Sequence, residues 1–252
     1  MGSDEKSYTF TGSRSVEGKI GPKNGVGRVR YVLNNLKFFK EKFMSRSIKV
    51  ISEVDLPAIN PSDVSVYKSR IYVNDAFSGK LLILNKDNIS FERSLDLPIK
   101  HPWGLHITDD HIFITDDIEQ EIYRLDNKNY EIEKKVKMNN VDLHGITSKD
   151  GRILINDWIS KSVLSFNEDL VLLKSEMHQM ASLPDLAGLC YRDGNFWQTD
   201  STLSIIYKYN INDNKSNYYK GINGHLHGID VFEKNRAVLV ERNKHKLYLI
   251  SF

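Results

Sequence analysis

The sequence has little cysteine and almost no net charge, and each shortage excludes a class of protein. Cys190 is the only cysteine among 252 residues, so no disulfide can form within the chain and nothing indicates an oxidising compartment. The 35 basic and 33 acidic side chains leave a net charge of +2. Because nucleic acid is bound largely through its phosphates by basic surfaces, no nucleic-acid partner is predicted.

Long apolar runs are also missing. No stretch approaches the roughly 20 apolar residues that a membrane-spanning helix needs, so no transmembrane segment is predicted. The first residues, Met-Gly-Ser-Asp-Glu-Lys, lack the apolar core of a signal peptide. A cytoplasmic location is therefore the expectation.

What the sequence does contain is one pattern repeated five times. Each copy has an apolar run, a turn, a second run that ends in an acidic residue, a four-residue turn and a third run, all rich in strand-forming residues. The copies align on an anchor column of Val64, Gly104, Gly145, Gly188 and Gly228. They also align on an acidic column of Asp75, Asp116, Asp157, Asp200 and Glu241. An acidic residue in every copy is expected to accept backbone N–H bonds in the next turn.

The spacing of the copies predicts the fold. The anchors are 40, 41, 43 and 40 residues apart, and four strands at a period of roughly 40–50 residues are typical of a propeller blade. A fourth run follows each of the first four copies, at 90–97, 131–138, 170–178 and 215–220. The fifth copy has no fourth run, and residues 47–55 are expected to supply it and close the ring. The prediction is an all-β protein: a five-bladed β-propeller of four-stranded antiparallel blades over residues 45–252, with six blades as the alternative.

Residues 1–44 form an N-terminal extension in this scheme. An amphipathic helix is predicted over about 29–44, with Val32, Leu36, Phe39 and Phe43 on one face. It is expected to pack across a face of the propeller, and the alternative is contact with a membrane surface or a protein partner. These residues lack the anchor that a sixth blade would need.

The Pro/His-x-Gly-hydrophobic starts and the hydrophobic-x-Thr/Asn-Asp ends of the copies resemble NHL-type, gluconolactonase-like and virginiamycin B lyase-like propellers. The resemblance covers about four-fifths of the chain and implies the architecture. Some propeller lyases of this kind hold a metal with histidines at the starts of inner strands, a placement that His144 and His227 share. The metal-binding Glu/Asn/Asp set of gluconolactonases is not recognisable.

The starts of the inner strands carry the residues that break the repeat. The position before the anchor is Asp63, Trp103, His144, Ala187 and His227, and the position two further back is Pro61, His101, Asp142, Asp185 and His225. Residues two apart on a strand share a side, so these side chains are expected at one mouth of the channel. Imidazole and carboxylate groups together bind Zn²⁺ and related ions and supply general acids and bases.

These positions give the predicted site. His144 and His227, which share the motif Leu-His-Gly-Ile, are the predicted catalytic residues. One divalent ion (Zn²⁺, Ca²⁺ or Mg²⁺) is predicted at the channel axis, with the ligands His144, His227, His225 and Asp63. Trp103, Trp158, His101, Asp142 and Asp185 are the predicted substrate-binding residues, the aromatic ones to stack on a sugar or anchor a peptide. The alternative for each residue is structural, as a turn cap or a backbone partner.

The predicted function is ligand binding at the channel mouth, as a metal-dependent lyase or hydrolase acting on a small molecule, a sugar or a modified peptide. The alternative is a non-catalytic module that binds a glycan or peptide, or a scaffold that holds a protein partner through the N-terminal helix. The sequence has no Gly-x-Ser-x-Gly elbow and no His-Glu-x-x-His motif. Cys190 and Trp197 are expected in the core.

Overall fold

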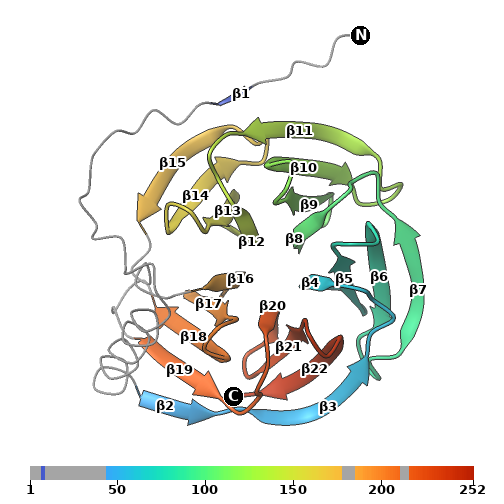
Figure 1. Ribbon diagram of the computed structural model, residues 1–252, viewed down its shortest axis with the longest axis vertical. Coiled ribbons are helices and arrows are strands. Elements are labelled where there is room, and N and C mark those ends of the chain that lie inside the picture. Colours follow the sequence, from blue (N-terminus) through green and yellow to red (C-terminus); the bar gives the residue numbers. More distant parts are fainter. Residues whose placement is uncertain (1–6, 9–43, 178–184, 211–215) are drawn as a thin grey trace, which may run out of the picture.

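The computed structural model describes residues 7–8, 44–177, 185–210 and 216–252, and its strands form five sheets around a central axis (Figure 1). Within each sheet, four strands run from an inner strand at the axis to an outer strand at the rim, each antiparallel to the next. The five-bladed propeller is thus confirmed, and the described residues build no sixth blade. The same residues contain no helix that is long and apolar enough to cross a membrane.

We number the blades by their anchors along the chain. Blade one consists of β4 (Pro61–Tyr67), β5 (Arg70–Asp75), β6 (Lys80–Asn85) and β7 (Phe91–Asp96). Blade two consists of β8 (Pro102–Ile107), β9 (His111–Asp116), β10 (Glu121–Asp126) and β11 (Ile132–Met138). Blade three consists of β12 (Leu143–Lys149), β13 (Arg152–Asp157), β14 (Ser162–Asn167) and β15 (Leu172–Met177). Blade four consists of β16 (Leu186–Arg192), β17 (Asn195–Asp200), β18 (Ile205–Asn210) and β19 (Ser216–Lys220). Blade five consists of β20 (Leu226–Glu233), β21 (Arg236–Glu241), β22 (Lys246–Ser251) and β3 (Lys49–Asp55).

The ring closes as the repeat predicts. Strand β3 pairs antiparallel with β22, with Asp55 opposite Lys246 and Lys49 opposite Ser251. The residues just before β3 form a strand that the sequence did not indicate. This strand, β2 (Met44–Ser47), pairs parallel with β19 of blade four. A further short strand, β1 (Ser7–Tyr8), pairs parallel with β11. The helix predicted over about 29–44 lies outside the described residues, apart from Met44 in β2.

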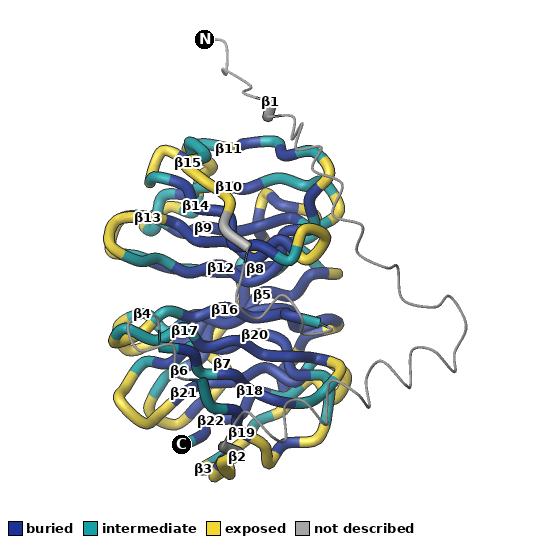
Figure 2. Tube along the Cα trace, turned by 90° about the vertical axis from the view of Figure 1, so that its left-hand side faces the viewer, coloured by how far each residue is buried: buried dark blue, intermediate teal, exposed yellow. Residues whose placement is uncertain are grey.

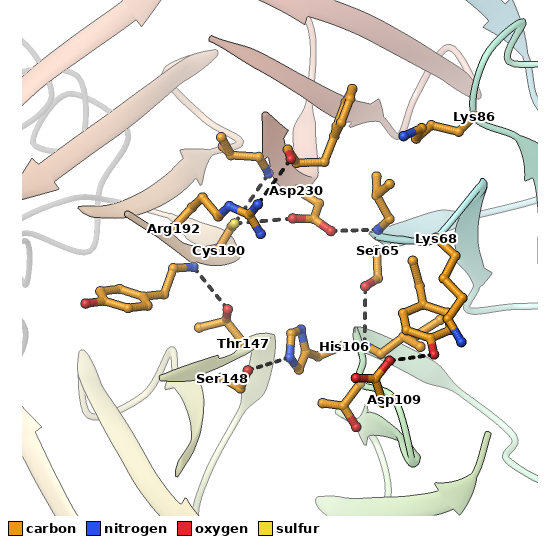
Figure 3. A pocket seen from close by; sticks show the side chains of 17 residues that line it. Ser65, Lys68, Lys86, His106, Asp109, Thr147, Ser148, Cys190, Arg192 and Asp230 are labelled. Atoms are coloured by element: carbon orange, nitrogen blue, oxygen red, sulfur yellow. Dashed lines mark hydrogen bonds between the residues drawn. The ribbon is translucent and has the colours of Figure 1, made fainter. Parts of the chain in front are cut away.

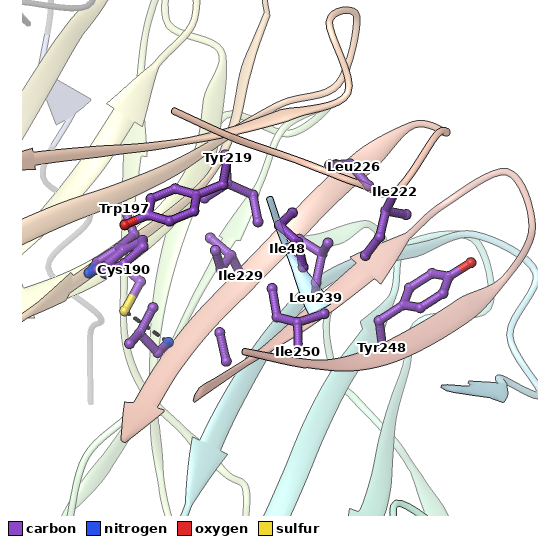
Figure 4. Packing of buried hydrophobic residues seen from close by; sticks show 13 residues of the cluster. Ile48, Cys190, Trp197, Tyr219, Ile222, Leu226, Ile229, Leu239, Tyr248 and Ile250 are labelled. Carbon is purple, nitrogen blue, oxygen red and sulfur yellow. Dashed lines mark hydrogen bonds between the residues drawn. The ribbon is translucent and has the colours of Figure 1, made fainter. Parts of the chain in front are cut away.

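Ile48 joins these two closing strands. Its side chain is buried in the apolar cluster between blades four and five, and its N–H donates to the carbonyl of Lys220 at 2.8 Å. Trp197 and Tyr219 of blade four meet Leu239 and other apolar side chains of blade five in the same cluster (Figure 4). A fully buried large apolar side chain contributes about 1.5–3 kcal/mol, so this packing stabilises the seam of the ring.

The core is divided among the contacts between neighbouring blades. Apolar side chains of blades five and one form one cluster, those of blades one and two a second, and those of blades two and three a third. Figure 2 shows buried strands in the interior and exposed turns at the edges. Because each blade packs only on its neighbours, the apolar pattern repeats along the chain.

Each inner strand departs from regular pairing just before its anchor. The register between inner and second strands shifts at this point in all five blades, as between Leu143 and Ile146 of β12, and in blades two to five the shift spans the anchor glycine. The anchor glycines sit where inner strands approach closely. A Cβ atom on Gly145 would lie 2.3 Å from the backbone nitrogen of Leu189, and one on Gly188 would lie 2.4 Å from the carbonyl of His227. Glycine is therefore required by close approach, which lets the inner strands crowd round a narrow axis.

The acidic column performs the structural role expected of it. Asp157 accepts N–H bonds from Asp142, which precedes the inner strand of its blade, and from Ile159 in the following turn. Asp75, Asp116, Asp200 and Glu241 accept the corresponding bonds in their own blades. These carboxylates hold the start of the inner strand beside the turn that follows the second strand.

Candidate functional site

The starts of three inner strands bring aromatic and imidazole rings together at one mouth of the channel. The ring centroid of Trp103 lies 5.5 Å from that of His144 and 5.3 Å from that of His227. The ring of His225 lies 5.3 Å from that of His227. These residues belong to blades two, three and five, so the predicted convergence across the channel is present. We call Trp103, His144, His225, His227 and the nearby Arg242 the histidine mouth.

His144 forms a pair with Asp142. Its Nε2 atom lies 3.1 Å from the Asp142 Oδ1 atom, and the imidazole is buried while the carboxylate is partly exposed. The main chain fixes the carboxylate's position, because the Asp142 N–H donates to Asp157 at 3.0 Å. The other ring nitrogen of His144, Nδ1, is buried and has no hydrogen-bond partner among the described residues.

Arg242 completes the mouth from the turn after β21. Its guanidinium carbon lies 4.6 Å from the centre of the Trp103 ring, and its Nη1 atom lies 3.4 Å from Nε2 of His227. Its Nε donates to the Asn60 side-chain oxygen. Among the described residues, no carboxylate lies within salt-bridge distance of this guanidinium. Burial lowers the pKa of Arg242 from its usual value, although an arginine stays charged in proteins.

Unsatisfied polar atoms concentrate at this mouth. Nδ1 of His144, Nδ1 of His225, Oδ1 of Asp117 and Nδ2 of Asn60 are all buried without a hydrogen-bond partner in the described part of the chain. An orphaned buried polar group costs about 1–3 kcal/mol, and native proteins have few of them. So many in one place indicate a site where a ligand or water supplies the missing partners.

Burial and neighbouring charges shift the titration of the groups here. Burial lowers the pKa of His227 well below its usual value, and the charge of Arg242 and the neighbouring imidazoles of His144 and His225 lower it further. His227 is therefore neutral at physiological pH and can accept a hydrogen bond from Arg242. Burial also raises the pKa of Asp117, which the nearby His144 partly offsets.

The other predicted residues lie around the mouth or behind it. Trp158 donates from Nε1 to Asp185 Oδ1 at 3.1 Å, and Lys161 lies over its ring with Nζ 4.0 Å from the centre. These three residues form a separate group between blades three and four. Among the hydrogen bonds of the described residues, His101 takes part only through its main-chain N–H, which donates to Asp116 at 3.2 Å.

Asp63 does not share the position of the histidines: strand pairing places it level with the anchor Gly145, and Ser62 level with His144. Its Oδ2 accepts the N–H of Leu105 at 3.0 Å and its Oδ1 accepts that of Val64 at 2.9 Å, so it links blades one and two. Burial raises its pKa well above the usual value. Neither oxygen is hydrogen-bonded to a histidine of the described chain.

The donor set does not fit the predicted metal. A catalytic zinc site takes three protein ligands, and Ca²⁺ takes six or more oxygens. Within residues 44–177, 185–210 and 216–252, no group of three or more His, Cys, Asp or Glu side chains is arranged to hold a metal ion. The oxygens of Asp63, one of the four proposed ligands, accept main-chain N–H bonds instead. The ion at the channel axis stays a prediction.

Sequence reasoning missed Arg242, Asp117 and Asn60. A signal for two of them was present: the position after the acidic column reads Ala76, Asp117, Trp158, Ser201 and Arg242. This column breaks the repeat as clearly as the histidine column does. Asn60 carries no such signal, because its role comes from contact with a residue at the far end of the chain.

Exposed apolar side chains surround the same face. Ile59, Phe77, Ile118 and Ile159 are 63%, 65%, 60% and 58% exposed. Three of them occupy the same turn, two residues after the acidic column, in blades one, two and three. The acidic residue of each blade bonds both that turn and the start of the inner strand, so these side chains lie on the face of the histidine mouth. We call these four residues the apolar rim.

The comparisons with known proteins show the fold. No family model matches the chain, and no curated protein matches its sequence. Among solved structures, glutaminyl cyclase from Myxococcus xanthus is similar with a TM-score of 0.69 and 13% identity, over 83% of this chain and 97% of that one. Virginiamycin B lyase from Staphylococcus aureus is similar with a TM-score of 0.55 and 11% identity, over 82% of this chain and 100% of that one. The chain is thus similar in architecture to these propellers.

Proposed function

We propose that the histidine mouth is an acid–base active site for a small molecule or a peptide, and that its reaction is of the lyase or cyclase kind. The observation that carries this proposal is the pair formed by His144 and Asp142. A carboxylate bonded to one imidazole nitrogen fixes the tautomer and orientation of the ring, and stabilises the imidazolium that forms when the ring accepts a proton. Asp142 is the orienting group and His144 is the group that moves the proton.

Arg242 and His227 supply the second part of the chemistry. Removing a proton from a substrate leaves negative charge, and a fixed cation in a half-buried site stabilises that charge more than it would in water. Arg242 lacks a carboxylate partner among the described residues and is held against Trp103 and His227. In the proposed mechanism His227 stays neutral, positions the guanidinium and adds no competing charge.

Two further observations support an enzyme for an amphipathic substrate. The two structural neighbours carry the names of a cyclase and a lyase on the same architecture. The apolar rim offers exposed side chains such as Phe77 and Ile118 next to the polar mouth, where the apolar body of a substrate can rest. The acid–base pair would then act on the part of the substrate that enters the mouth.

The second candidate is a binding module for a peptide or glycan. The pair formed by Trp158 and Asp185 favours it, because an aromatic face beside a carboxylate recognises sugars and peptides without chemistry. In that case the apolar rim and Trp158 hold the ligand, and His144 is only part of the wall.

The experiment compares turnover in wild type and variants. Wild-type protein is incubated with a peptide library and with a mixture of small metabolites, and products are detected by mass spectrometry. We expect His144→Ala to reduce the rate of product formation by about 100-fold or more. Asp142→Asn should reduce it too and change its pH profile, because the ring loses its orienting charge.

His111→Ala is the matched control, since this histidine lies at the far end of β9 and pairs with Glu133. It should leave turnover unchanged. Turnover by His144→Ala at the wild-type rate would refute the acid–base role. Wild-type protein that binds a library peptide tightly and converts none would establish the binding module instead.

A further inference from the structure

The other end of the channel holds a cavity that the proposed chemistry does not use. It has a volume of about 480 Å³ and is lined by the ends of all five inner strands. Figure 3 shows its side chains arranged in a ring around an opening. We call it the opposite pocket and define it by Ser65, His106, Thr147, Cys190 and Asp230. Its volume is within the range of small-molecule sites, which is roughly 300–1,000 Å³.

The floor of the opposite pocket presents two hydroxyl donors. Ser65 Oγ accepts the N–H of Ile107 at 3.2 Å, and Thr147 Oγ1 accepts that of Tyr191 at 3.0 Å. Both side chains are at least 97% buried, with exposed fractions of 2% and 3%. Each hydroxyl oxygen thus accepts a main-chain N–H bond with one of its lone pairs. Neither hydroxyl donates its own hydrogen to an acceptor among the described residues. Two buried O–H groups are free to donate to a ligand.

The one histidine among the described residues that line the pocket, His106, is neutral at physiological pH and supplies no positive charge. His106 Nε2 is bonded to Ser148 Oγ at 2.8 Å, and burial lowers the pKa of His106 to about 4. Strand pairing places Ser65, His106, Thr147, Cys190 and Asp230 at the same position of the five inner strands. All five are polar or ionisable and no two are alike, so the requirement of the fold for a repeated residue does not explain them.

Cations occupy the rim of the opposite pocket. Lys68, Lys86 and Arg192 line it, and Figure 3 shows them on different sides of the opening. Neither Lys68 nor Lys86 has a carboxylate within salt-bridge distance in the described part of the chain. The carboxylate within salt-bridge distance of Arg192 among the described residues is that of the exposed Asp193, at 3.9 Å, and Nη2 of Arg192 also donates to the Phe232 carbonyl at 3.4 Å. The lining carboxylates are Asp109, which accepts a bond from Tyr67 at 2.9 Å, and Asp230.

We propose that the opposite pocket binds a small organic anion, with its charged group between Lys68, Lys86 and Arg192 and its acceptor atoms on the hydroxyls of Ser65 and Thr147. Charge-assisted hydrogen bonds of this kind are about twice as strong as neutral ones, and uncharged hydroxyl donors add orientation. The site is separate from the histidine mouth, because the inner strands start at one mouth and end at the other. Anion binding in the opposite pocket therefore does not depend on the function proposed for the histidine mouth.

Asp230 makes this binding depend on pH. Its Oδ2 accepts the N–H of Val66 at 2.6 Å and its Oδ1 faces the Cys190 thiol at 3.4 Å, while Asp63 and Arg192 are the charged groups that act on it. Burial raises the pKa of Asp230 to about 6. Below that pH the carboxyl is neutral, and above it the carboxylate repels an anion. Anion affinity should therefore fall as the pH rises through about 6.

The test uses naphthalene-1,5-disulfonate, an organic dianion whose charge does not change across this pH range, in calorimetric titrations of the full chain. Lys68→Gln, Lys86→Gln and Arg192→Gln should each weaken binding by about 3–10-fold. Lys49→Gln removes an equal charge from the exposed edge of the outer strand β3 and should have no effect. Wild type should bind several-fold more tightly at about pH 5 than at about pH 8, whereas Asp230→Asn should bind equally at both.

Three results would overturn the proposal. The first is no measurable binding of the disulfonate by a wild-type protein that melts cooperatively. The second is equal weakening by Lys49→Gln and by the three pocket variants, which would indicate general charge attraction. The third is loss of binding in Arg242→Gln with no change in Lys68→Gln and Lys86→Gln, which would place the anion at the histidine mouth.

Discussion

The two mouths of the channel are built from opposite ends of the same five strands, and they differ in how their polar groups are satisfied. The histidine mouth has rings in contact and four buried polar atoms without partners among the described residues. In the opposite pocket, Ser65, Thr147 and Asp230 each accept a main-chain N–H bond. Buried polar atoms without partners, as at the histidine mouth, indicate a site where a ligand supplies the missing hydrogen bonds. Polar groups that are already bonded to the main chain but can still donate, as in the opposite pocket, indicate a site that binds a ligand without chemistry.

The close packing of the inner strands between the two mouths depends on the anchor glycines. Gly145 separates His144, which faces one mouth, from Thr147, which faces the other. A Cβ atom on Gly145 would meet the backbone of β16, so glycine is what lets β12 lie directly against that strand. The largest effect on both mouths should therefore come from this position.

Gly145→Ala is expected to destabilise the fold by more than about 3 kcal/mol, or to prevent folding, because the new Cβ atom meets backbone atoms that cannot move aside. Its ideal position lies 2.3 Å from Leu189 N and 2.6 Å from Ala187 O. Urea denaturation measures the change. Gly151→Ala is the control: nothing lies within 4 Å of its Cβ position, and the positive φ of 70° accounts for a loss of about 1 kcal/mol. Similar losses for both variants would contradict the close-approach explanation.

Asp230→Asn should change the pH dependence of stability. The folded pKa of about 6 is above the usual value of 3.8, so the folded state holds the extra proton between these two pH values. The wild-type free energy of unfolding therefore falls as the pH rises from about 4 to about 6, by up to about 1.4 kcal/mol per unit, and this loss persists above pH 6. The amide that replaces the carboxyl group cannot ionise, so the variant lacks this fall.

Urea titrations of both proteins at about pH 4.5 and about pH 7 give the difference. Asp109→Asn is the matched control, because this carboxylate lies at the more exposed edge of the same pocket. Parallel pH profiles for wild type and Asp230→Asn would mean that Asp230 is ionised throughout the range.

Trp103→Ala should expose the histidine mouth to water. The indole contacts His144, His227 and the guanidinium of Arg242, so its removal reduces the burial that lowers the pKa of His227. We expect this pKa to rise toward its usual value, measured by NMR titration of the imidazole carbons. Trp158→Ala should leave it unchanged, since Trp158 contacts Asp185 and Lys161 instead. An unchanged His227 titration in Trp103→Ala would show that the indole does not seal the mouth.

The fold could be predicted further than the site, and the reason is physical. Each blade buries its apolar side chains against the next, so the same pattern recurs around Gly145 and Gly188. The missing strand of blade five is predicted at 47–55, and the structure has it at Lys49–Asp55. The parallel pairing of β2 with β19 could not be predicted, because it extends a complete blade and follows no repeated pattern.

The site was partly predictable because one column of the repeat carries Trp103, His144 and His227. The remaining members come from contacts across the channel or across the seam. Arg242 lies in a turn of blade five but stacks on Trp103 of blade two, and Asn60 bonds to it from the loop before blade one. No local pattern contains such contacts, since their partners are distant in sequence.

The seam has a consequence for the order in which the protein folds during synthesis. Strand β3 emerges from the ribosome before any complete blade, and its partner β22 is the last strand described. Blades one to four can form while β3 has nothing to pair with, and blade five forms only when the late strands arrive. Strand β3 therefore stays without its antiparallel partner while blades one to four form, and the charges of Lys49, Glu53 and Asp55 on its exposed positions oppose edge-to-edge pairing with another chain.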